Sequence, residues 1–148
     1  MNIVHYRAKV KYPTNCYIFG SLKSEGTWVY GEPHVNTKIP HIHENEHQKQ
    51  PIDVSTLGRS TGYCDRRGEL IFEGDIVEGQ TRHGIKRCVV QFSHGCFHYG
   101  ISERGSSTKV HPYLLNSKVL VVGNIYDNPN LIQDQAELSQ SVTDYGNI

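Results

Sequence analysis

The fold class is decided by the stretch Glu69-Leu70-Ile71-Phe72-Glu73-Gly74-Asp75-Ile76-Val77-Glu78. Short apolar runs lie on both sides of a polar turn in this stretch. Gly74 lets the backbone reverse, and Asp75 is suited to accept hydrogen bonds from the turn amides. Ile76 and Val77 begin the next strand, because β-branched side chains favour extended backbone. The stretch therefore predicts a turn that leads directly into a strand.

Apolar segments with strand character continue on both sides of this turn. We expect strands over residues 3–10, 27–31, 85–92, 95–101 and 118–126, and one short helix over 129–138. In the first of these, alternation places Tyr6, Ala8 and Val10 on one face and Arg7 and Lys9 outward. Glycine and polar turns separate the strands. The predicted fold is mainly β, with a small SH3-like barrel or sandwich-type core, extra N-terminal strands and one short C-terminal helix.

Composition excludes several classes of protein. The chain has 148 residues with 15 basic and 15 acidic side chains, so its formal net charge of zero argues against a dedicated duplex-DNA binder. No apolar run approaches the roughly 18 residues needed to cross a bilayer, and the first residues lack the apolar stretch of a secretory signal. We therefore expect a cytoplasmic protein, in the cytosol of a host cell if its origin is viral, with no membrane partner.

Three separated motifs resemble those of one family. They are Tyr6-Arg7-Ala8-Lys9 with Trp28-Val29-Tyr30-Gly31, the long run from Gly58 to Val77, and Val121-Val122-Gly123-Asn124-Ile125-Tyr126-Asp127-Asn128-Pro129. Their order and spacing over residues 3–132 resemble the YopX family of bacteriophage and prophage proteins. The resemblance implies a viral or prophage origin and a β-rich fold. It supplies no catalytic residues, because the family has no established activity.

The motifs suggest a division of the chain into three parts. Residues 1–57 are expected to form an N-terminal β segment with a His-rich surface loop over 32–52, since that stretch carries Pro33, Pro40 and Pro51 and few apolar residues. Residues 58–132 are expected to form the barrel-like core that carries the long family-like run. Residues 133–148 form an acidic tail that is expected to fray.

No catalytic constellation is recognisable, so we expect a protein that is not an enzyme and needs no cofactor. Glu73 and Asp75 are better explained by turn bonding than by acid/base catalysis. Histidines of the loop, His41, His43 and His47, have metal-compatible spacings, but a solvated loop is favoured and no metal is expected. A zinc site from Cys88, Cys96 and either His94 or His98 matches no standard spacing.

Cationic and aromatic side chains provide the candidate ligand site. Arginine forks match phosphate oxygens, and aromatic faces stack on bases. The predicted phosphate- and base-binding residues are Arg7, Lys9, Trp28, Tyr30, Arg59, Tyr63, Arg66 and Arg67. The alternative, that the aromatics are core and the arginines are solvated, stays open. A second basic group, Arg82, His83, Lys86 and Arg87, is better explained as a solvated strand edge.

Three functions follow from these residues. The favoured one is a phage-encoded, non-catalytic binding protein, in which a homo-oligomer sequesters a nucleotide or cyclic nucleotide that serves as a host immune signal. The second is a nucleic-acid-binding β-barrel module in phage replication or expression. The third is a protein-interaction module that inhibits a host protein.

Overall fold

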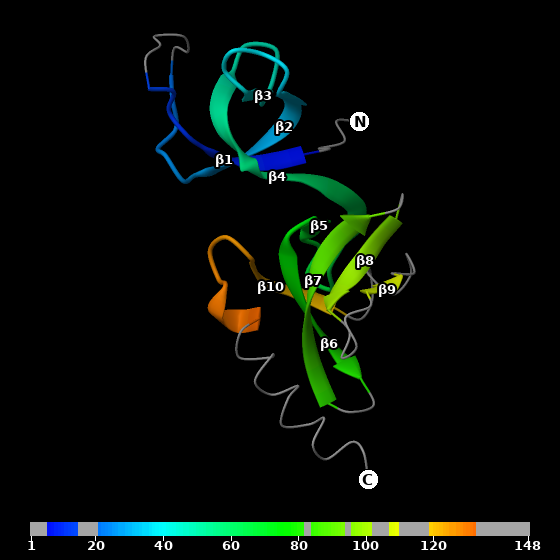
Figure 1. Ribbon diagram of the computed structural model, residues 1–148. Coiled ribbons are helices and arrows are strands. Elements are labelled where there is room, and N and C mark those ends of the chain that lie inside the picture. The colour runs from blue at the N-terminus through cyan, green and yellow to red at the C-terminus, as the bar shows by residue number, and fades with distance from the viewer. Residues whose placement is uncertain are drawn as a thin grey trace. The chain divides into compact units, whose positions relative to one another are not determined.

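The chain folds into two β units, which we describe separately. The structure, a computed structural model, describes residues 6–14, 21–81, 84–93, 96–101, 107–109 and 119–132. The N-terminal unit comprises Met1–Ser60 and the C-terminal unit Thr61–Ile148 (Figure 1). The prediction of a mainly β fold is confirmed.

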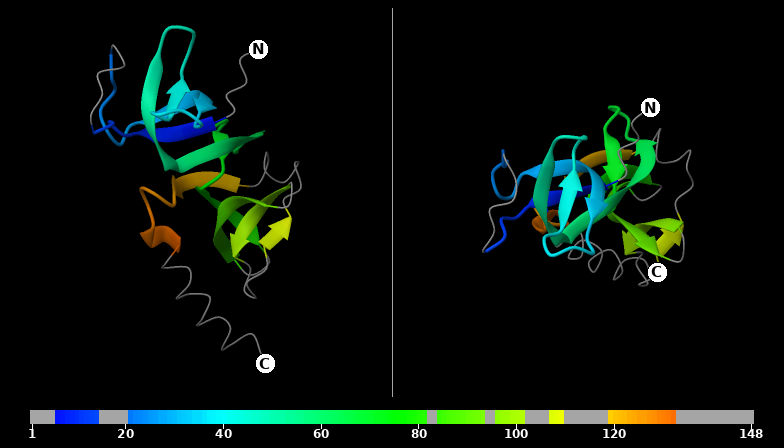
Figure 2. Two further views of the ribbon diagram at one scale, coloured as in Figure 1. Left: turned by 45° about the horizontal axis from the view of Figure 1, so that its top comes forward. Right: turned by 90° about the horizontal axis from the view of Figure 1, so that it is seen from above.

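Four antiparallel strands form the N-terminal unit. They are β1 (Tyr6–Val10), β2 (Trp28–His34), β3 (His41–His43) and β4 (Lys49–Cys64), the last of which continues into the C-terminal unit. β1 pairs with β2, β2 with β3 and β3 with β4, and β4 pairs again with β1. Figure 2 shows β3 between β2 and β4. The pairing thus closes into a ring of strands.

The interior of this ring is apolar. Its buried residues are Ala8, Val10, Val29, Ile42 and Ile52, with Leu57 packed against them. Ala8, Val29 and Ile42 are fully buried, and each aliphatic side chain of the size of Val or Ile contributes roughly 1.5–3 kcal/mol when buried. The predicted inward alternation of β1 is therefore confirmed for its described apolar residues. The strand pairings of the closed ring lie within residues 6–59, whereas the sequence had suggested 58–132 for the barrel-like core.

The predicted long loop over residues 32–52 is wrong. This stretch contains the end of β2, all of β3 and the start of β4. Two prolines of this stretch take part in backbone hydrogen bonding through their carbonyl groups. The Pro40 carbonyl accepts from the Ile52 amide at 3.0 Å, and the Pro51 carbonyl accepts from the Lys11 amide at 3.1 Å. Ile42 alone supplies the buried side chain of the three-residue β3.

The C-terminal unit is an antiparallel sheet in the order β10-β6-β7-β8-β9. Its strands are β6 (Asp75–Thr81), β7 (Gly84–Ser93), β8 (Cys96–Ile101), β9 (Ser107–Lys109) and β10 (Val119–Asn124), while β5 (Leu70–Phe72) pairs with β4. Ile71, Val77, Val90 and Val119 form its buried core.

The turn between β5 and β6 has the predicted chemistry. Gly74 has a φ of 90°, which an L side chain rarely adopts. The Asp75 carboxylate, 1% exposed, accepts a hydrogen bond from the Phe72 amide at 2.8 Å. The roles predicted for the glycine and the aspartate are therefore confirmed.

The predicted C-terminal helix begins where expected. Residues 130–132 are helical directly after Pro129, a residue preferred at the start of helices. Its predicted continuation and the acidic tail over 133–148 lie outside the described residues. Within the described part of the chain, no helix is both long and apolar enough to cross a membrane.

Candidate ligand-binding face of the N-terminal unit

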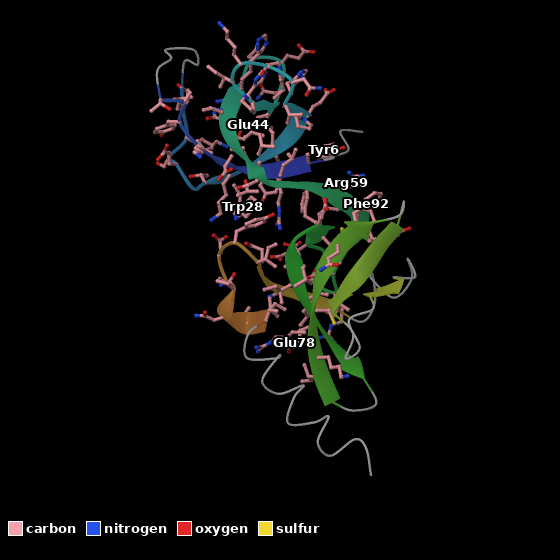
Figure 3. All side chains as sticks on the ribbon, in the orientation of Figure 1. Tyr6, Trp28, Glu44, Arg59, Glu78 and Phe92 are labelled. Carbon is pink, nitrogen blue, oxygen red and sulfur yellow. The ribbon has the colours of Figure 1, made fainter. Side chains whose placement is uncertain are left out.

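Four of the predicted ligand residues share one face of the β1–β2 pair. Lys9 is the cross-strand partner of Trp28, and Arg7 is the partner of Tyr30. Directly opposite residues point to the same face of a sheet, so these four lie on the face away from Ala8 and Val29 of the core. We call them the tryptophan face. Figure 3 labels Trp28 and Tyr6 at opposite ends of the β1–β2 pairing.

Two cations approach the same indole ring on this face. The guanidinium carbon of Arg7 lies 4.5 Å from the Trp28 ring centroid, and the ammonium nitrogen of Lys9 lies 5.4 Å from it. Both distances are within the range of a cation–π interaction. Arg7 is 7% exposed and Tyr30 is 43% exposed. Arg7 thus points away from the core as predicted but is itself packed, whereas Tyr30 offers ring surface to solvent.

Arg59 does not join this face. Its cross-strand partner on β1 is Tyr6, while the partner of Arg7 is Gly58. Because successive residues of a strand point to opposite faces, Arg59 lies on the face opposite to Arg7. The prediction that Arg59 binds the same ligand therefore has no support from the strand register.

Two of the three predicted residues of the C-terminal unit, Tyr63 and Arg67, have side chains that are engaged by the fold. Tyr63 packs against the apolar core, as the open alternative for the aromatic residues anticipates. The guanidinium of Arg67 donates to the Val121 carbonyl at 2.8 Å. Arg66 has an exposed side chain, and its amide donates to the Val119 carbonyl at 3.1 Å. Tyr63 and Arg67 therefore connect parts of the C-terminal unit to one another.

Asp65 organises the turn over residues 65–69, which connects β4 to β5. Its buried carboxylate accepts hydrogen bonds from the amides of Arg67 at 2.8 Å, Glu69 at 3.0 Å and Val121 at 3.0 Å. Burial tends to raise the pKa of Asp65, but these amides and the Arg67 guanidinium together lower the pKa below its ordinary value. A single carboxylate thus closes the turn and fastens it to β10.

Asn124 organises the turn after β10 in the same way. Its side-chain oxygen accepts from the amides of Tyr126 at 3.0 Å and Asp127 at 2.9 Å. The Asn128 side-chain oxygen accepts from the Asn124 amide at 3.2 Å. A Cβ at Gly123 would come within 2.5 Å of that Asn128 oxygen, so a side chain there would displace it. The third family-like motif, which runs from Val121 to Pro129, is therefore also explained by hydrogen bonds to the backbone.

A family model described as YopX protein matches residues 5–133. The chain belongs to the YopX family. It is also similar to the X-ray crystal structure of protein yopX from Bacillus subtilis, with 21% sequence identity, coverage of 88% of this chain and 98% of that chain, and a TM-score of 0.42. A comparison with curated proteins found no match.

The second basic group lies partly outside the described residues, which exclude Arg82 and His83. Of the remaining two residues, Arg87 forms an ion pair with Glu78 on the neighbouring strand at 3.1 Å. This pairing reduces the positive charge that Arg87 presents to a phosphate, as expected for a solvated strand edge.

The cysteine-based zinc site, which the sequence did not favour, is not tested, because the structure does not describe His94 or the side chains of Cys96 and His98. Cys88 is half-buried beside the apolar core. Burial raises the pKa of its thiol, against the opposing charge of Lys86. A protonated thiol is a poor zinc ligand.

The sequence prediction missed His34. This residue lies at the end of β2, directly opposite His41 of β3. His34, His41 and His43 form a group in which one ring nitrogen from each residue lies within 4.8 Å of the other two. We call these three residues the histidine cluster. The signal was present in the sequence: a six-residue connection over 35–40 joins His34 to His41, as in a hairpin that pairs them. His47 lies in the following turn, outside the cluster.

A separate hollow of about 420 Å³ lies in the N-terminal unit, with Lys11, Tyr12, Lys38 and Ile39 among its lining residues. The Tyr12 hydroxyl is held by a hydrogen bond to the Lys23 carbonyl at 2.7 Å. The volume falls within the range of small-molecule sites. None of the predicted ligand residues lines this hollow.

Proposed function

We propose that this YopX-family protein is a non-catalytic binding protein that takes a nucleotide-type ligand on the tryptophan face. One observation carries the proposal: Arg7 and Lys9 both lie against the Trp28 ring, and the exposed Tyr30 ring lies on the same face. Aromatic rings stack on bases and cations bind phosphate. The face therefore combines the two chemistries that a nucleotide requires.

The face carries two cationic side chains. Arg7 and Lys9 bring their charged groups towards one ring, and both kinds of side chain form charge-assisted hydrogen bonds with phosphate oxygens. Arg7 is already largely removed from water. Ligand binding at Arg7 would therefore cost less free energy for dehydrating and ordering this side chain.

The exposure of each side chain indicates its role in ligand binding. Tyr30, 43% exposed, is the natural platform for a base, and stacking on an aromatic side chain contributes roughly 1–3 kcal/mol per base. Lys9 is half-buried and supplies the charge that a phosphate would meet. Arg7 holds the Trp28 ring in place. We propose these roles for the four residues.

The biological role extends this proposal. The family resemblance implies a phage or prophage origin, and the sequence lacks recognisable catalytic motifs. A protein that binds a nucleotide without converting it removes that molecule from solution. We therefore propose a counter-defence role, in which the protein sequesters a nucleotide-type immune signal of its host.

The test uses the fluorescence of Trp28, the single tryptophan of the chain. Purified protein is titrated with 3′,5′-cyclic AMP, cyclic di-AMP, ADP-ribose and a twelve-nucleotide oligothymidylate, and thermal stability is measured with each ligand. We expect at least one small nucleotide to change the fluorescence and raise the melting temperature. Binding only by the oligonucleotide, weakening steeply with salt, would support the nucleic-acid-binding alternative instead.

Matched variants locate the binding. Lys9→Met removes the charge and Tyr30→Ala removes the exposed ring, and each is expected to weaken binding about tenfold. Lys49→Met is the control, because it removes one positive charge from an exposed side chain on β4 of the same unit, outside β1 and β2. Equal binding by all three variants, or no response to any of the ligands, would refute the proposal.

A further inference from the structure

We infer that the histidine cluster, His34, His41 and His43, is a binding site for a divalent transition-metal ion of the zinc class. The site uses none of the residues of the tryptophan face, so the inference is independent of the proposed function. Strand pairing brings the three imidazoles together. His34 and His41 are direct cross-strand partners, and His43 lies two residues beyond His41 on the same face of β3.

The ring nitrogens are already close to a coordination geometry. The Nε2 atoms of His41 and His43 are 3.2 Å apart, and one nitrogen from each of the three rings fits within 4.8 Å. Tetrahedral zinc with Zn–N bonds of 2.0–2.1 Å separates its ligand nitrogens by about 3.3 Å. Rotation of the exposed His34 side chain would bring its ring nitrogen to this distance from the nitrogens of His41 and His43.

A backbone contact orients one ligand. The Nδ1 atom of His41 lies 2.8 Å from the Ile39 carbonyl, which can only accept, so Nδ1 carries the proton. In this tautomer the ring presents the Nε2 lone pair towards His43. Metal-binding histidines are commonly fixed by such a second contact. In the metal-free protein, His43 Nε2–H donates to this lone pair. Metal binding through Nε2 of His43 moves the proton of that ring to Nδ1, so the ligand is a neutral imidazole.

Two oppositely charged residues flank His43 on the neighbouring strands. Lys49 of β4 is its cross-strand partner on one side. Glu32 is the cross-strand partner of His43 and shares its face. Neutral imidazole is the form that binds metal, and its nitrogens suit zinc, nickel, cobalt or copper better than magnesium or calcium.

Gly31 makes the approach of the two strands possible. Its φ is 153°, and a Cβ at this position would overlap the carbonyl oxygen of His43. The glycine therefore lets β2 lie close to β3 at the cluster. It is a positioning residue and does not contact the metal.

The experiment is a zinc titration of the full chain by calorimetry, with any purification tag removed. We expect one Zn²⁺ per chain and a higher melting temperature in its presence. His34→Gln, His41→Gln and His43→Gln should each weaken binding at least about tenfold. His47→Gln, four residues beyond the cluster, is the matched control and should bind as the unaltered chain does.

Cobalt(II) distinguishes this site from the cysteine-based alternative. A histidine site gives visible absorption without the near-ultraviolet charge-transfer band of a thiolate ligand. The inference is overturned if the chain binds no zinc, if the cluster variants bind as tightly as His47→Gln, or if a thiolate band appears and the cluster variants retain it.

Discussion

The two units use their polar side chains in opposite ways. In the C-terminal unit, Asp65, Arg67 and Asn124 direct their side chains to backbone groups of the unit itself. On the outer face of the N-terminal ring, cations approach an indole and three imidazoles gather around one point. The comparison teaches that the longest family-like motif specifies turns. Ligand chemistry is better sought on β1, β2 and β3.

Asp65→Ala should have the largest effect. It removes the acceptor of three amide hydrogen bonds in a buried position, so we expect the free energy of unfolding to fall by roughly 3–5 kcal/mol. Urea denaturation measures the change, and amide exchange at Val121 locates it in the C-terminal unit. Asp53→Ala serves as the control, because the Asp53 carboxylate is only half-buried and accepts its hydrogen bonds from the amide and hydroxyl of the nearby Ser55. Equal losses in the two variants would remove the special role given to Asp65.

Gly31→Ala should be the next most damaging change. The new Cβ overlaps backbone, so we expect a loss of about 2 kcal/mol or more and weaker zinc binding. Gly26→Ala is the matched control: its φ of 83° is also positive, but a Cβ there meets nothing within 4 Å. It should cost about 1 kcal/mol and leave zinc affinity unchanged. If the two variants behave alike, close strand approach does not shape the histidine cluster.

Arg67→Met should lower the free energy of unfolding less than Asp65→Ala or Gly31→Ala does. The variant loses one hydrogen bond to the Val121 carbonyl, and the side chain is 59% exposed, so we expect a loss of about 1 kcal/mol in unfolding free energy. Nucleotide binding should not change. A variant of unaltered stability that binds nucleotide less well would reassign Arg67 to the ligand.

Acid should weaken the C-terminal unit through Asp65. Its pKa is lower folded than unfolded, so its contribution is complete above the unfolded value, near 3.9, and is lost as pH falls through the folded pKa. Carbon NMR of the side-chain carboxyl group measures this titration. A midpoint at or above the ordinary aspartate value would show that the amide bonds do not stabilise the charged form.

Much of the fold could be predicted from the sequence. Alternation placed Ala8 and Val10 inside, and turn chemistry assigned Gly74 and Asp75 correctly. The hairpin of β2 and β3 was missed because Pro33 and Pro40 interrupt a stretch with few apolar residues. Only the closed ring shows that Ile42 fills the core and that the proline carbonyls are used as acceptors.

The candidate site was less predictable. Sequence shows that arginine and aromatic residues are near one another along the chain, but it does not show which backbone carbonyl Arg67 binds. Strand register separated Arg59 from Arg7 and joined Lys9 to Trp28. These outcomes depend on contacts between residues distant in sequence, which no local pattern records.

The most direct test compares one exposed or half-exposed cation from each unit in a single binding assay. Lys9→Met and Arg66→Met each remove one positive charge, and both are titrated by Trp28 fluorescence with the nucleotide of the panel that binds the unaltered chain most tightly. We predict that Lys9→Met weakens binding about tenfold while Arg66→Met binds as the unaltered chain does. Weaker binding by Arg66→Met with unchanged binding by Lys9→Met would contradict the account.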